Sequence, residues 1–229
     1  MAVIDTYPVP TDHQALTNQI RGTVLKALKI VLSLSALFVF SGFAAAQPRF
    51  DIYFGMGTAH DGSTHQLIDF TDSGIPIETP AMDGVFGNFG GAVMLTPSFG
   101  FGGEVLLRFQ KADYAGLEYR PIFYDFNGIW TPSLGKHVVP EIQAGLGGLN
   151  LRFYNPNAYY YDYYTGQYTN FAGSINHFQL HAAVGLRVYI TDTVFIRPQV
   201  DYHWVRNMQE FNSNSVPAFT VAIGYSSAR

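Results

Sequence analysis

A long, strict alternation of apolar with polar or small residues is the feature that most constrains this chain. Between Phe178 and Ile190 every even-numbered position is apolar, while the odd-numbered positions carry His, Gln, Arg, Tyr, Ala and Gly. A period of two predicts a β-strand with one apolar and one polar face. The run is much longer than the ~5–6 residues usual for a globular strand. Its length instead suits a tilted strand that crosses a bilayer.

Similar runs recur along the chain and are separated by connections of two kinds. The predicted strands span residues 49–58, 84–96, 101–111, 117–131, 137–153, 175–190, 193–206 and 216–226. Short turns lie at 96–100, 131–136 and 191–193, and longer segments lie at 59–83, 112–116, 154–174 and 207–215. Short turns on one rim together with both termini, and long loops on the other rim, are typical of an outer-membrane barrel.

Closure of the sheet follows from the hydrocarbon environment, where no water satisfies the backbone groups of an edge strand. The sequence therefore predicts an all-β fold, an eight-stranded antiparallel up-and-down transmembrane barrel with a nearly filled interior. A soluble barrel with an apolar interior is the alternative, and it would place charged residues outside. In the 117–131 run, the parity of Glu118 and Arg120 predicts a bulge near Pro121. Aromatic residues near the ends of the runs predict interfacial girdles; they are Tyr53, Tyr119, Trp130, Tyr189, Tyr202, Trp204 and Tyr225.

The N-terminal segment is predicted to be a targeting signal rather than part of the fold. A basic stretch containing Arg21, Lys26 and Lys29 precedes an uncharged apolar run from Ile30 to Phe43, and then Ala44–Ala46. This order describes a secretory signal peptide with an extended n-region, residues 1–46, cleaved after Ala46. An uncleaved anchor helix is the alternative. Residues 47–229 then form the barrel domain, exported through the periplasm to the bacterial outer membrane.

Composition excludes several functional classes. The chain of 229 residues has a formal charge of −4, which offers no basic surface for nucleic acid. It has no Cys, so disulfides, thiolate metal sites and cysteine nucleophiles are excluded. We expect outer-membrane lipid as the surroundings, an extracellular or cell-surface ligand bound through the loops as the partner, and a monomer.

The hairpin HFQLHAAVGLRVYITDTVFIRPQVDYHWVR and the final strand FTVAIGYSS carry a resemblance to a known family. With the signal peptide, they resemble the small outer-membrane β-barrel superfamily of the OmpA/OmpX-like type, over residues 47–229. The resemblance implies the fold and the location, but no substrate and no active site. In that family the last strand usually ends in an aromatic residue, whereas here Ser226, Ser227, Ala228 and Arg229 follow Tyr225.

The inward faces of the predicted strands carry charges that we expect to pair inside a narrow lumen. The predicted polar network comprises Glu104, Arg108, Glu141, Arg187, Arg197, Asp201, His181 and His203. Glu104 and Glu141 are expected to pair with Arg187 and Arg197. Such a network either fills the barrel and fixes its register, or acts as a gate for small polar solutes.

Two loops are candidates for binding. Residues 154–168 are unusually rich in Tyr, whose rings suit contact with carbohydrate or protein; a structural role, with rings stacked across a hairpin, is the alternative. The candidate contact residues are Tyr159, Tyr160, Tyr161, Tyr163, Tyr164 and Tyr168. His60, Asp61 and His65 match no specific metal site, and Asp61-Gly62 is typical of a turn. No metal and no cofactor are expected.

Three functions remain open from the sequence. The favoured one is a non-enzymatic barrel with a structural or surface-interaction role through its long loops. The second is a narrow porin-like channel for small polar solutes. The third is a lipid-modifying enzyme, which would need an outward His–Ser pair. His203 has the parity of the lumen and no Ser follows it at the required spacing, so no catalytic residue is expected.

Overall fold

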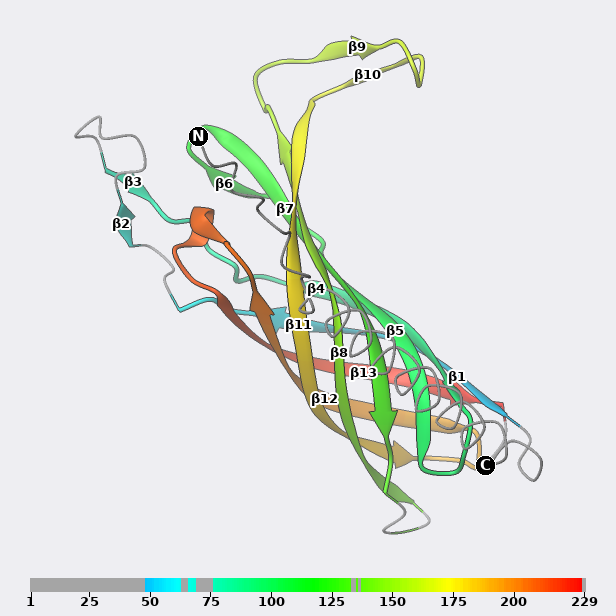
Figure 1. Ribbon diagram of the computed structural model, residues 1–229. Helices are drawn as coiled ribbons and strands as arrows, with labels where there is room; N and C mark the ends of the chain where they lie inside the picture. The colour runs from blue at the N-terminus through cyan, green and yellow to red at the C-terminus, as the bar shows by residue number, and fades with distance from the viewer. Residues whose placement is uncertain (1–47, 63–65, 69–75, 133–134, 136, 228–229) are drawn as a thin grey trace, which may run out of the picture. The chain divides into compact units, whose positions relative to one another are not determined.

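The computed structural model describes residues 48–62, 66–68, 76–132, 135 and 137–227 of the chain (Figure 1). The predicted signal peptide therefore lies outside the described residues, as does His65. Within the described part of the chain, no helix is both long enough and apolar enough to cross a membrane.

Eight antiparallel strands close into a barrel, as the alternation predicts. The order around the ring is β5-β4-β1-β13-β12-β11-β8-β7, and β7 pairs again with β5 to close it. The strands are β1 (Arg49–Ala59), β4 (Phe86–Met94), β5 (Phe99–Arg108), β7 (Leu117–Trp130), β8 (Val138–Tyr154), β11 (Phe171–Tyr189), β12 (Val194–Val205) and β13 (Ser215–Ser226). Each predicted run corresponds to one of these strands, and every backbone edge of the ring is paired.

The outer wall of the barrel is apolar and the interior is polar. Val184 on β11 is 62% exposed, whereas the neighbouring inward residue Arg187 is fully buried. Leu180 and Val200 face outward in the same way, and Arg197 is buried. This orientation suits a lipid environment and excludes the soluble alternative, in which these apolar side chains would pack centrally.

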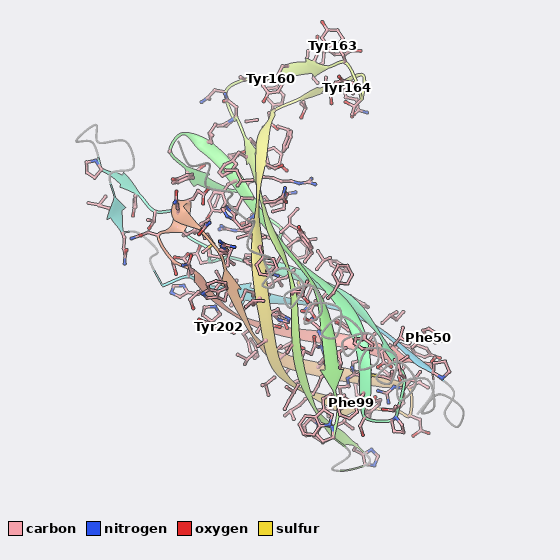
Figure 2. All side chains as sticks on the ribbon, in the orientation of Figure 1. Phe50, Phe99, Tyr160, Tyr163, Tyr164 and Tyr202 are labelled. Carbon is pink, nitrogen blue, oxygen red and sulfur yellow. The ribbon has the colours of Figure 1, made fainter. Side chains whose placement is uncertain are left out.

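Two rims bear outward aromatic side chains. Phe50 and Phe99 lie at the end that carries the short turns, and Tyr202 lies on the outer wall further toward the long loops (Figure 2). The Phe99 ring stacks on Trp130 with 6.3 Å between centroids. Trp204 and Tyr225 are also exposed outward. These positions match interfacial girdles at the two membrane surfaces.

Three of the predicted girdle residues are placed wrongly by the sequence analysis. Tyr53, Tyr119 and Tyr189 are buried inside the barrel. Each lies on the inward parity of its strand, and parity decides which way a side chain points. Their aromatic type suggested an interface, but the alternation around them already favoured the lumen.

The predicted bulge near Pro121 is also absent. The pairing of β7 with β8 runs in continuous register from Glu118↔Tyr154 to Trp130↔Ile142. Glu118 and Arg120 are therefore on the outward face, at the loop end of the strand. Glu118 accepts a hydrogen bond from Lys111 at 2.7 Å, and Arg120 donates one to the carbonyl of Phe109 at 3.1 Å. The strand needs no bulge to accommodate these charged groups, because Lys111 and the carbonyl of Phe109 bind them at this end of the barrel.

The long connections contain short elements of their own. These are β2 (Leu67–Ile68), β3 (Ile77–Glu78), β6 (Ala112–Tyr114), β9 (Tyr160–Asp162), β10 (Gln167–Thr169) and the 3-10 helix η2 (Gln209–Phe211). β2 pairs with β3, β9 pairs with β10, and β6 pairs with the start of β7. β8 and β11 are the longest strands, and they carry the β9–β10 hairpin well beyond the other loops (Figure 1).

Candidate functional site: the polar lumen and the tyrosine hairpin

The first layer of the lumen, nearest the short turns, is centred on Arg187 of β11. Its guanidinium donates to the carboxylates of Glu141 on β8 and Asp51 on β1. Asp51 also accepts a hydrogen bond from the hydroxyl of Ser226 at 2.6 Å and contacts Arg49 at 3.2 Å. Arg187 thus connects β11 with β8 and β1, and Asp51 extends these contacts to Ser226 at the end of β13.

The next layer is centred on Arg197 of β12. It donates to Glu104 at 2.6 Å and to Glu141 at 3.2 Å, so Glu141 is shared between the two arginines. The guanidinium also lies 3.5 Å from the centroid of the Tyr53 ring, whose hydroxyl donates to Glu104 at 2.9 Å. Gly90 makes room for this ring, because a Cβ there would meet the Tyr53 hydroxyl at 2.4 Å. The lumen is therefore packed as well as paired.

Amide side chains continue the network toward the loops. Gln199 donates to Glu104 at 3.4 Å and to Asp201. The two ring nitrogens of His181 lie 3.1 Å from Asp201 and 2.9 Å from the Oδ1 of Asn127. His203 follows, with its ring stacked on His181 at 4.8 Å between centroids. This side chain ends the polar column, since its other face meets the Phe123 ring.

An apolar cluster closes the lumen above His203. Phe86, Leu106, Phe123, Leu149, Leu151, Val205 and Val216 from the wall pack with Met82, Met208 and Phe211 from the loops. All these side chains are fully or almost fully buried. Met82 is held in place by a hydrogen bond from its backbone N–H to the carboxylate of Asp61 at 3.1 Å. We call this the apolar cap.

Arg108 was predicted to join the central network, but the structure places it elsewhere. It lies beside the apolar cap, where it donates to the carbonyl of Ala81 at 2.9 Å and lies 3.5 Å from Asp83. The carbonyl of Ala81 also accepts a hydrogen bond from the Tyr119 hydroxyl. Arg108 thus fastens a loop over the mouth of the barrel rather than neutralising Glu104 or Glu141.

The structure brings the other predicted lumen residues together and adds partners that the sequence analysis missed. The missed residues are Asp51, Tyr53, Asn88, Asp125, Asn127, Gln143, Gln179, Gln199 and Ser226. All of them lie on inward parity, so a list of every inward polar residue would have included them. Asp51 and Asp125 have the same inward position and the same charge as Glu104, so the rule that selects Glu104 applies to them as well.

The tyrosine hairpin, residues 159–168, is an ordered projection. Tyr161 packs edge-to-face against Tyr163 and Tyr168, with centroids 5.2 and 5.4 Å apart. Tyr160 donates a hydrogen bond to the carbonyl of Phe171. Tyr163 and Tyr164 remain almost completely exposed at the tip (Figure 2). Tyr159 and Tyr168 are also largely exposed.

Asp162 shapes the tip of the tyrosine hairpin. Its carboxylate accepts hydrogen bonds from the backbone N–H of Tyr164 and the hydroxyl of Thr165, both at 2.9 Å. These bonds lower the pKa of Asp162, with the Tyr164 N–H as the largest cause. Gly166 completes the turn at φ +69°, a conformation that residues with a Cβ rarely adopt. The two exposed rings at the tip are therefore held on a defined turn.

Among the residues of the first loop, His60 is exposed and its backbone N–H bonds to the carbonyl of Pro217. Asp61 is buried and engaged with Met82. These two residues therefore serve the loop structure in the described part of the chain.

Comparison with known proteins shows a likeness of fold. No family model matches the chain, and no curated protein matches it. Among solved structures, OprG of Pseudomonas aeruginosa is similar at 12% identity with a TM-score of 0.51, covering 79% of this chain and 96% of that one. Neisserial surface protein A matches at 9% identity and a TM-score of 0.49, covering 80% and 97%. Ail of Yersinia pestis, solved with the heparin analogue sucrose octasulfate, matches at 12% identity and 0.47, covering 79% and 99%.

The likeness to OprG concerns the fold. This chain and OprG share the fold of a small, closed antiparallel β-barrel. Its paired edges, apolar outer wall and arrangement of short turns and long loops are those of a protein of the bacterial outer membrane.

Proposed function

We propose that this barrel is a closed membrane anchor that presents the tyrosine hairpin to an uncharged ligand outside the cell. The observation that carries the proposal is the exposure of Tyr163 and Tyr164, which are 88% and 102% exposed on an otherwise hydrogen-bonded turn. Exposed aromatic rings on a fixed support bind at a small entropic cost, because few side-chain rotamers are lost.

The character of the tip favours a neutral partner. Asp162 is the only carboxylate between residues 155 and 170, and no Lys, Arg or His occurs there. Asp162 is already used within the turn. Flat amphipathic rings with hydroxyl groups suit the apolar faces and hydroxyls of a neutral oligosaccharide. An aromatic or apolar protein surface is the other class of partner to be distinguished by experiment.

The filling of the lumen supports an anchor over a channel. Ion pairs and amides occupy the part near the short turns, and the apolar cap occupies the part near the loops. An aqueous path through the barrel would have to disrupt both the polar network and the apolar cap. A lipid-modifying enzyme has little support, because His203 faces the lumen and is stacked between Phe123 and His181.

The test is binding of the full chain, reconstituted in nanodiscs, to an array of neutral oligosaccharides and to an array of extracellular matrix proteins. The double variant Tyr163→Ser/Tyr164→Ser should lose binding by at least about tenfold. The matched variant Tyr163→Phe/Tyr164→Phe keeps the rings and should retain most of the binding. Binding that survives the Ser substitutions would refute the proposal, and binding only to the protein array would replace the glycan by a protein partner.

Conductance separates the channel from the anchor. In planar bilayers the wild-type chain should show no stable ion current, because the apolar cap lies across the route. A steady current that is altered by Glu141→Gln would favour the channel instead.

A further inference from the structure

Two buried carboxylates in the lumen lack an arginine partner. Asp51, Glu104 and Glu141 are shared among Arg49, Arg187 and Arg197. Asp125 and Asp201 lie beyond these arginines, and among the described residues neither is within 4 Å of a Lys or Arg nitrogen. Both are almost completely buried. Uncompensated charges in such surroundings are costly, so these carboxylates require a positive partner that Lys and Arg do not supply.

His181 lies between these two carboxylates in an arrangement that leaves one nitrogen facing acceptors. Its Nε2 lies 3.1 Å from Asp201, a bond that places the proton on Nε2 of the neutral ring. Its Nδ1 then presents a lone pair to the Oδ1 of Asn127 at 2.9 Å and to Asp125 at 3.5 Å. Asn127 cannot turn its amide group toward Nδ1 without cost, because its Nδ2 donates to Asp125 and Gln143. Three acceptor atoms thus converge where a cation is required.

His203 supplies an independent sign of a ligand. Its side chain is almost fully buried, yet neither ring nitrogen has a hydrogen-bond partner among the described residues. The ring is stacked on His181 and belongs, with His181 and Asp125, to a group whose ligand atoms lie within 4.8 Å of one another. A buried imidazole without partners is destabilising unless something binds it.

We propose that the lumen holds one divalent first-row transition-metal ion, bound by the carboxylate of Asp125 and the imidazoles of His181 and His203. Nitrogen and carboxylate ligands suit Zn²⁺ and its neighbours in the series, which bind such atoms at about 2.0–2.2 Å. Asp201 accepts the Nε2 proton of His181, and this contact orients the ring for binding through Nδ1. The ion's two charges balance Asp125 and Asp201.

The ligand atoms need only a small movement to reach bonding geometry. Tetrahedral ligands around Zn²⁺ lie roughly 3.3–3.5 Å apart, given bonds of about 2.0–2.1 Å. The present spread of 4.8 Å therefore closes by a shift on the order of 1 Å. His203 can make this shift, since no hydrogen bond holds it in its present position.

The direct test is the amount of metal retained by the full chain refolded in detergent with Zn²⁺ and then passed over a chelating resin. We expect about one Zn²⁺ per chain by elemental analysis. When the protein is loaded with Co²⁺ instead, its visible absorption spectrum should show the bands of a low-symmetry coordination site. The His203→Phe protein should not retain the stoichiometric ion. The introduced Phe ring should pack against Phe123, as the imidazole ring of His203 does. Asp125→Asn should lose it as well. Asp201→Asn should weaken binding roughly 10- to 100-fold, as expected for loss of a group that orients a ligand.

The matched control is His60→Gln, which removes an exposed loop histidine and should leave the metal content unchanged. Folding of each variant is checked by the shift in gel mobility between unheated and heated samples. Absence of retained Zn²⁺ in the wild type would overturn the proposal. So would a folded His203→Phe protein that retains the ion, or a loss of the ion in His60→Gln, which would indicate adventitious surface binding.

Discussion

Replacing Glu141 with Gln tests whether the lumen ion pairs stabilise the barrel. Glu141 accepts from Arg187, from Arg197 at 3.2 Å and from Gln143 at 2.6 Å, and it is fully buried. The substitution removes the shared negative charge and leaves an amide donor facing two guanidinium groups. Breaking a buried pair on one side costs about 3–5 kcal/mol.

The expected loss of stability lies near the lower end of this range, because each arginine keeps one carboxylate partner. Arg187 retains Asp51, and Arg197 retains Glu104. We therefore expect a decrease of about 3 kcal/mol in the free energy of unfolding, or roughly a hundredfold in the equilibrium constant.

The assay is reversible urea unfolding of the protein in lipid vesicles, followed by Trp fluorescence. The chain has two Trp residues, Trp130 and Trp204, and both are on the outer wall, so their emission reports release from lipid. Glu118→Gln is the matched control, because it removes a partly buried pair with Lys111 at the loop end of the strand, which should be worth about 1 kcal/mol. If the two variants unfold alike, the buried pairs do not carry the stability assigned to them.

Three further outcomes follow from the same structure. Val184→Arg puts a charge near the middle of the lipid-facing wall and should cost about 2–4 kcal/mol in the vesicle assay, unless the wall does not face lipid there. Gly224→Val should lower the free energy of unfolding by about 1–3 kcal/mol, because a Cβ there would lie 2.2 Å from the Phe195 ring. Gly173→Ala is its control and should change stability by less than about 0.5 kcal/mol, because a Cβ there would have no atom within 4 Å. The pKa of Asp162 is lowered in the folded turn, so its contribution is complete above the unfolded pKa and is lost as pH falls through the lower folded value. The protection of the hairpin amides from hydrogen exchange, taken relative to the intrinsic exchange rate at each pH, should therefore decrease only at acidic pH, and Asp162→Asn should abolish that dependence.

The strands could be predicted because alternation reports directly on the two environments of a barrel wall. Every predicted run became a strand, including the 175–190 run whose apolar face is now seen outside. Short turns were also predictable from their length. The direction of a side chain follows from its parity, so Glu141, Arg187 and Arg197 were placed inward correctly.

The failures have two physical causes, the weight given to residue type over position and the unknown stagger between strands. Tyr53 was assigned to an interface for its ring, although its neighbours Ile52 and Phe54 already occupied the lipid face. Arg108 was grouped with the central charges because parity fixes the radial direction but not the height along the lumen. Height depends on the stagger between strands, which the hydrophobic pattern of single strands does not specify.

The unequal lengths of the strands have a consequence for where the tyrosine hairpin can act. The lipid-facing part of β11 starts near Phe178, and the segment 171–177 continues toward the hairpin. At ~3.3 Å per residue this extension measures roughly 23 Å along the strand, or about 16 Å in height at a tilt of ~45°. One headgroup layer is only about 5–8 Å thick. β8 and β11 thus form a stalk that lifts the aromatic tip clear of the lipid surface, and trimming paired residues from both strands would lower the tip into the headgroups without altering a single tyrosine.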